Sequence, residues 1–218
     1  MLSHELKARV LQGARATPAP DRMAMRRIET LAVAAATAIA VGLFVALGGL
    51  RAAPRPELLI AGTSLGAVLV ALAAAWTALG RGGSMLGRPR AVLAATTIAA
   101  PAVLFAWKVL FSTRFAGMTD PWPDRPGLKC LALSLAVGVW PLAACVLLRR
   151  GSDPLHPTLS GAALGVTAGA LSWTLVDLWC PVAYVPHLLL GHLLPLLMLT
   201  GIGAALGARV LAVRATGI

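Results

Sequence analysis

Charged residues are scarce in this sequence, and their scarcity excludes most kinds of soluble protein. Of 218 residues only 12% are charged, whereas 58% are hydrophobic; a soluble domain is nearer ~25% charged. A single core of this size could not bury so much apolar surface, which excludes a water-soluble globular protein. The same hydrophobicity excludes a disordered chain. A membrane protein remains.

Catalytic signatures are also missing from the sequence. It contains no HExxH, P-loop or paired carboxylates, and its three cysteines show neither a CxxC nor zinc-knuckle spacing. No acidic residue lies at the centre of an apolar run, which argues against a proton-coupled pump or a channel with a charged filter. We therefore predict a protein that is not an enzyme, and we assign it no cofactor and no metal ligand.

Six apolar runs, each bounded by proline, glycine or charge, are long enough to cross a bilayer as helices of about 20 residues. The expected fold class is all-α, a polytopic transmembrane bundle of six helices. Residues 1–29 form a polar tail, residues 30–211 form the membrane domain, and residues 212–218 form a second tail. The spans are placed at about 30–50, 57–79, 91–111, 129–148, 158–179 and 186–208.

The distribution of basic residues predicts the orientation. The net charge is +11, from 19 Lys and Arg against 8 Asp and Glu. In a soluble protein this excess would suggest nucleic acid, but in a membrane protein basic residues collect on the cytoplasmic side. Thirteen lie before the first span, after the last span and in the loops 80–90 and 149–157, and four lie in the other loops. We predict that both termini are cytoplasmic and that nucleic acid is not contacted directly.

The N-terminal tail contains a short amphipathic segment. Residues 4–15 favour a helix, and the prolines within 17–20 end it. Apolar residues fall on one side of this helix and basic residues elsewhere. It either docks into a groove of a partner protein or rests on anionic lipid, and the proline joint favours a partner. The candidate partner-binding residues are Leu6, Lys7, Arg9, Val10 and Leu11.

Glycines recur every four residues in three of the spans, which predicts smooth helix faces where backbones approach closely. Prolines inside the spans predict kinks. The glycine stripes are Gly161, Gly165 and Gly169; Gly62 and Gly66; and Gly203 and Gly207. The prolines are Pro101, Pro141 and Pro195.

Three ionisable residues near the outer ends of spans form a candidate polar cluster: Lys108, Asp177 and His187. Ionisable groups are costly in hydrocarbon and mark functional sites. Lys108 and Asp177 either pair, or they lie separately at the headgroups with the lysine snorkelling. We favour separate positions, since both residues are near span ends.

Two cysteines lie at the same predicted rim, Cys130 at the start of the fourth span and Cys180 at the end of the fifth. They either form a disulfide, act as thiol sensors or soft-metal ligands, or are two unrelated small apolar residues. His187 and His192 follow them, and their spacing of five does not place both on one face of an α-helix.

The layout resembles the NrsF/CarR-type six-span anti-sigma factors of bacteria over nearly the whole chain. The resemblance rests on the tail pattern LKARVL-ARATPAP, on six spans in about 210 residues, on Lys129-Cys130, and on the block LVDLWCPVAYVPHLLLGHLLP followed by GAALGARVL. It implies a protein of the bacterial inner membrane that holds an extracytoplasmic-function sigma factor through its N-terminal segment and releases it on a stimulus.

The NrsF branch ties its response to two periplasmic cysteines, which by position would be Cys130 and Cys180. The CarR branch responds to light through a pigment elsewhere, and the sequence does not assign this chain to either branch. Two other functions compete with the anti-sigma factor. A small transporter for a metal or apolar solute would need polar groups at mid-span, of which there are few. A membrane thiol or redox enzyme usually carries a CxxC, which is missing.

Overall fold

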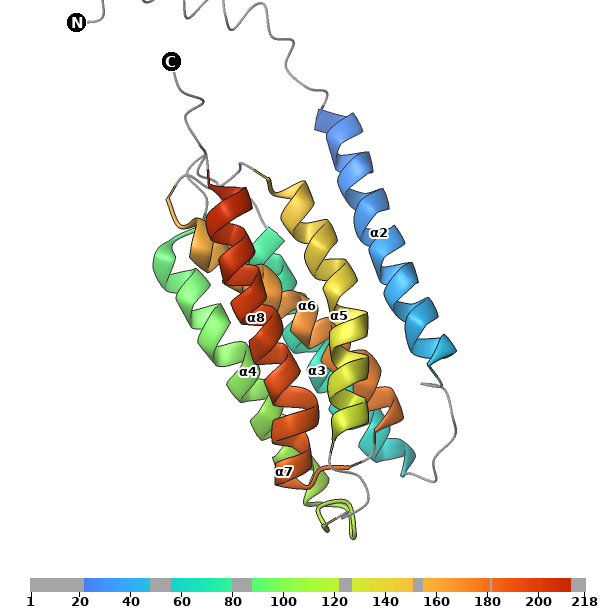
Figure 1. Ribbon diagram of the computed structural model, residues 1–218. Coiled ribbons are helices and arrows are strands. Elements are labelled where there is room, and N and C mark those ends of the chain that lie inside the picture. Colours follow the sequence, from blue (N-terminus) through green and yellow to red (C-terminus); the bar gives the residue numbers. More distant parts are fainter. Residues whose placement is uncertain are drawn as a thin grey trace, which may run out of the picture.

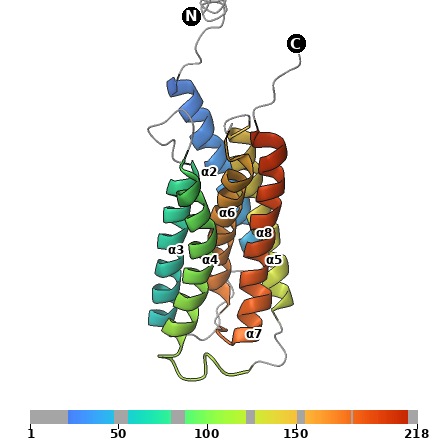
Figure 2. The same cartoon turned by 90° about the vertical axis from the view of Figure 1, so that its left-hand side faces the viewer.

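The protein is a bundle of long helices packed side by side (Figures 1 and 2). The computed structural model describes residues 22–47, 56–79, 88–121, 127–150, 155–180 and 182–212. All regular elements within these ranges are helical, and five of the helices are long and apolar enough to cross a membrane. The predicted fold class, an all-α membrane bundle, is therefore confirmed.

The helices follow the apolar runs of the sequence. From α3 onward, each begins within one residue of the start expected for a span. The last is a continuous rod of four segments, α7, η1, α8 and η2, of which η1 and η2 are turns of π-helix. The bounds are α2 Arg22–Ala46, α3 Glu57–Leu79, α4 Arg90–Ser112, α5 Leu128–Leu148, α6 Pro157–Trp179, α7 Val185–Leu188, η1 Leu189–Leu193, α8 Leu194–Leu206 and η2 Gly207–Leu211.

The first helix differs from the expected span of residues 30–50. Helix α2 begins at Arg22, inside the predicted tail, and its apolar part covers Leu31–Ala46. At 1.5 Å per residue this part is about 24 Å long, shorter than the ~30 Å of a bilayer core. Helix formation continues past the apolar boundary, because arginine and methionine are good helix formers.

Helix α6 is the centre of the bundle. Helices α3, α4, α5 and α8 all pack against it, so that every residue from Ser160 to Ala170 is buried. Figure 2 shows α6 running between these neighbours. Its residues are mostly glycine, alanine, serine and threonine, and this small size lets four helices approach one axis.

The predicted glycine stripes of the fifth and sixth spans face each other. A Cβ atom on Gly161 would collide with the backbone of Gly203 and Gly207, and one on Gly165 would collide with the backbone of Leu199 and Thr200. Such contacts bring two helix backbones together and gain dispersion energy that lipid cannot replace. They fix α8 against α6.

Helix α2 lies at the edge of the bundle, beside α5 (Figure 1). Its buried side chains Ala36, Ala40 and Phe44 follow one another at every fourth position. They form a single narrow stripe, and most of the other apolar side chains described on α2 are exposed. The start of α2 and the end of η2 lie at the same end of the bundle (Figure 1).

The π-turn η1 has a local cause in the sequence. Pro195 has no N–H to donate to the carbonyl of Gly191, and its ring would clash with that carbonyl in a regular α-helix. The preceding residue, Leu194, instead donates its N–H to the carbonyl of Leu189, five residues back. The turn widens and absorbs the proline without ending the helix.

The glycine contact between α6 and α8 makes a prediction about stability. We expect Gly165→Ala to lower the free energy of unfolding by about 1–3 kcal/mol, because the added methyl group meets backbone atoms that cannot rotate away. Gly201→Ala is the matched control, since a Cβ there meets nothing within 4 Å. Denaturant titration of the protein in mixed micelles measures both. Equal stability of the two variants would show that the helices are not in close contact.

Candidate functional site

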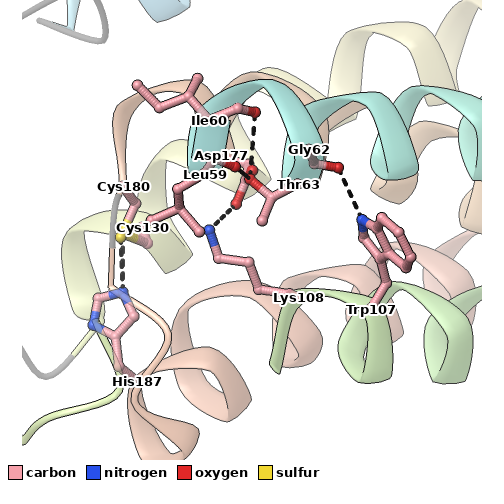
Figure 3. Close-up of polar contacts among 10 residues, drawn as sticks. All are labelled: Leu59, Ile60, Gly62, Thr63, Trp107, Lys108, Cys130, Asp177, Cys180 and His187. Atoms are coloured by element: carbon pink, nitrogen blue, oxygen red, sulfur yellow. Dashed lines mark hydrogen bonds and ion pairs between the residues drawn. The ribbon is translucent and has the colours of Figure 1, made fainter. Parts of the chain in front are cut away.

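Four buried side chains meet at the end of the bundle opposite to Arg22 and Leu211: Cys130, Cys180, His187 and His192. We call them the Cys/His site. One ligand atom from each lies within 4.8 Å of the others. Nε2 of His187 is 3.1 Å from Sγ of Cys180 and 3.6 Å from Sγ of Cys130 (Figure 3). These residues are 1–4% exposed, so solvent barely reaches the cluster.

Three helices deliver these side chains, and the last helix carries both histidines. Cys130 lies in the first turn of α5, Cys180 ends α6, His187 is in α7, and His192 is in η1. The sequence separates the outermost two by more than sixty residues, so the site exists only when the helices assemble. Both cysteines are thiols in the described structure, and their pairing as a disulfide stays a prediction.

Two glycines allow the start of α5 to press against the last helix. Gly127 precedes α5 with a positive φ of 94°, a conformation that favours glycine. A Cβ on Gly127 would lie 3.0 Å from the carbonyl oxygen of His187, and one on Gly191 would lie 2.9 Å from Cβ of Cys130. The close approach brings Cys130 next to both histidines.

The expectation that His187 and His192 lie on different helix faces is wrong. Their ring centroids are 5.7 Å apart. The expectation assumed 3.6 residues per turn, for which positions five apart diverge. The π-turn η1 begins after His187 and includes His192, and its hydrogen bonds between residues five apart bring such residues onto the same side. Pro195, three residues after His192, was the signal in the sequence for this disturbed turn.

His192 is a buried histidine, and neither of its ring nitrogens has a hydrogen-bond partner among the described residues. Its ring packs at 5.2 Å from that of Trp173, which is itself buried. An unsatisfied buried polar group costs about 1–3 kcal/mol. A group that is kept in a native structure at such a cost indicates a functional role.

A buried ion pair lies beside the Cys/His site. Nζ of Lys108 on α4 contacts Oδ1 of Asp177 on α6, and both residues are almost completely buried (Figure 3). The favoured interpretation, in which these residues lie separately at the headgroups, is wrong because both point into the bundle from adjacent helices. His187, expected in the same polar cluster, instead contacts the two cysteines.

The third cysteine and the tail residues are not part of this site. Cys145 lies in the last turn of α5, about 22 Å along the helix from Cys130. The candidate partner-binding residues Leu6, Lys7, Arg9, Val10 and Leu11 lie outside the residues that the structure describes.

Because of the ion pair, we expect a single substitution to destabilise the protein more than a double substitution that removes both charges. Lys108→Met leaves the carboxylate of Asp177 buried without its counter-charge, and we expect a loss of about 3–5 kcal/mol in the free energy of unfolding. Lys108→Met combined with Asp177→Leu removes both charges and should recover most of this loss. Denaturant titration in mixed micelles compares the two. A double variant no more stable than the single one contradicts the pairing.

Comparison with known proteins identifies the family. The family model NrsF, described as negative regulator of sigma F, matches residues 14–212. No curated protein and no solved structure shows a significant match. The family match covers every helix described above, including all four residues of the Cys/His site. The chain therefore belongs to the NrsF family: it is a helical membrane protein and a negative regulator of a sigma factor.

Proposed function

We propose that the protein is an anti-sigma factor of the bacterial inner membrane. It holds an extracytoplasmic-function sigma factor through its cytoplasmic N-terminal segment and releases it when a stimulus reaches the Cys/His site from the periplasm. The protein thus inhibits transcription, and stress relieves this inhibition. It carries out no catalysis, and its partners are the sigma factor and the bilayer, without direct contact to nucleic acid.

The distribution of basic residues supports a cytoplasmic binding segment and a periplasmic sensing site. Basic residues are concentrated in the two tails and in the loops 80–90 and 149–157, which favours a cytoplasmic position for both termini. Residues 1–29 and 212–218 then face the cytoplasm, and residues 30–211 cross the membrane six times. The Cys/His site lies at the opposite, periplasmic end.

The observation that carries the proposal is that the tail-bearing helix packs into the same apolar cluster as the two cysteines. Ala40 and Phe44 of α2 belong to the same buried apolar cluster as Cys130 and Cys180. Phe44 is only 2% exposed and is the largest side chain that α2 buries. A change in the separation of the two cysteines therefore alters the surface on which α2 rests.

The tail itself supplies the binding surface. Leu6, Val10 and Leu11 share one side of the short helix that residues 4–15 favour, and Lys7 and Arg9 lie beside them. An amphipathic helix of this kind lays its apolar side into a groove, while basic residues select an acidic rim. A small inhibitory segment needs to cover only one surface of the sigma factor.

A pull-down tests the retention of the sigma factor. We expect a sigma factor to elute with the full chain from detergent-solubilised membranes and to disappear when residues 1–20 are deleted. Deletion of residues 213–218 is the control and should leave retention unchanged. Retention by the chain without residues 1–20 would place the binding surface elsewhere. If nothing elutes with the full chain either, the anti-sigma function fails, and solute transport becomes the alternative to assay.

Substitution of the two rim cysteines tests the sensing step separately. We expect the double variant Cys130→Ser and Cys180→Ser to retain the sigma factor but to lose the transcriptional response, because the serine hydroxyls lack the redox and metal chemistry of thiols. A reporter gene under the sigma factor measures the response. Cys145→Ser, at the other end of α5, should respond normally. A normal response of the double variant would falsify the role of the cysteines.

A further inference from the structure

We propose that Cys130, Cys180, His187 and His192 together bind one divalent metal ion of the zinc and cadmium class. The resemblance to anti-sigma factors implied a pair of cysteines alone, and the structure adds two histidines to it. The binding site is argued from its own geometry, whereas its regulatory effect on the sigma factor rests on the proposed function.

The spacing of the four ligand atoms is close to that of a tetrahedral site. With bonds of about 2.3 Å to sulfur and 2.0–2.1 Å to nitrogen, neighbouring ligands of zinc are about 3.3–3.8 Å apart. The two measured distances to Nε2 of His187 are 3.1 and 3.6 Å, and all four atoms lie within 4.8 Å. Small side-chain rotations are enough to close the set around one ion.

The chemistry of the donors selects the class of ion. Two sulfur and two nitrogen ligands suit soft and borderline ions, whereas magnesium and calcium require oxygen ligands. No carboxylate belongs to the set of four. Four protein ligands also leave no open position for a water or substrate, so the site is suited to binding rather than to catalysis.

The charge balance favours a divalent ion at this depth. When the ion binds, each cysteine forms a metal–sulfur bond as its thiol proton leaves to water, and each histidine donates a lone pair as a neutral ring. Two thiolates then neutralise the two positive charges, and two protons are released for each ion bound. A neutral complex avoids the cost of a net charge among residues that are only 1–4% exposed.

His192 is the residue that distinguishes this site from a simple pair of thiols. Its two ring nitrogens have no hydrogen-bond partner among the described residues, although its ring is 1% exposed. The π-turn η1 places the imidazole on the same side as His187. The orphaned nitrogens are explained if the ring is a metal ligand, and the π-turn that Pro195 imposes is of a kind that frequently marks functional sites.

Cadmium titration of the purified, reduced and metal-free full chain in detergent micelles tests the proposal. We expect one cadmium ion per chain, seen in the ultraviolet thiolate-to-cadmium charge-transfer band, with close to two protons released in weak buffer. An excess of zinc should displace the cadmium. Failure to bind cadmium, or binding that releases no protons, would overturn the proposal.

Histidine variants test the number of ligands. We expect His192→Phe to weaken cadmium binding at least about 100-fold, because one of four ligands is lost. His192→Gln, which keeps a polar side chain, provides a second measurement in case the phenylalanine variant does not fold. The matched controls are His156→Phe and Cys145→Ala, and both should bind as the unchanged chain does. If both His192 variants bind cadmium as tightly as the unchanged chain, His192 is not a ligand and the four-ligand set is overturned.

Metal binding and sigma retention can fail independently in these experiments. The titration contains no sigma factor, so a failed retention experiment leaves the metal site standing. Conversely, a chain that retains its sigma factor but binds no cadmium refutes the metal site and keeps the anti-sigma function. Release of bound sigma factor by cadmium from the full chain, but not from His192→Gln, is expected if the metal site is the sensor; equal release from both would exclude His192 from sensing.

Discussion

The arrangement of the bundle depends on the backbone contact between α6 and α8. Within a bilayer, apolar side chains gain little by leaving lipid, so helices associate where close packing is possible. Gly161 and Gly165 permit that packing against Gly203 and its neighbours. One turn after another, the same face continues through Gly169 to Trp173, which packs against His192. The glycine contact thus brings the start of α8, and η1 before it, close to the C-terminal end of α6, which Cys180 follows.

A second constraint acts within the last helix. Pro195 prevents a regular α-helical turn, and the resulting π-turn changes the direction in which His192 points. The turn lies against the start of α5, because Gly191 and Gly127 have no side chains to separate them. A proline and two glycines, none of which carries chemistry, therefore determine that two imidazoles and two thiols converge.

The sequence was informative wherever a signal depends on one helix alone. Apolar run lengths gave the fold class, and glycine spacing gave the faces that meet. It was less informative about contacts between helices: the pairing of Lys108 with Asp177 joins residues 69 positions apart. The side of the helix occupied by His192 was misjudged for another reason, since periodicity assumes a regular α-helix and Pro195 breaks that regularity. The start of α2 at Arg22 was missed because helix formation is not confined to apolar residues.

The same packing also decides which helix is suited to carry a signal through the membrane. Helix α8 is a poor candidate, because its glycines interlock with the backbone of α6 and any sliding would bring backbone atoms into collision. Helix α2 packs mainly on α5, through a narrow stripe that ends at Phe44, a member of the apolar cluster that includes the two cysteines. Its other end leads into the tail. If the proposed function holds, a change at the Cys/His site therefore reaches the cytoplasm through α2, as a shift of a weakly seated helix against a rigid core.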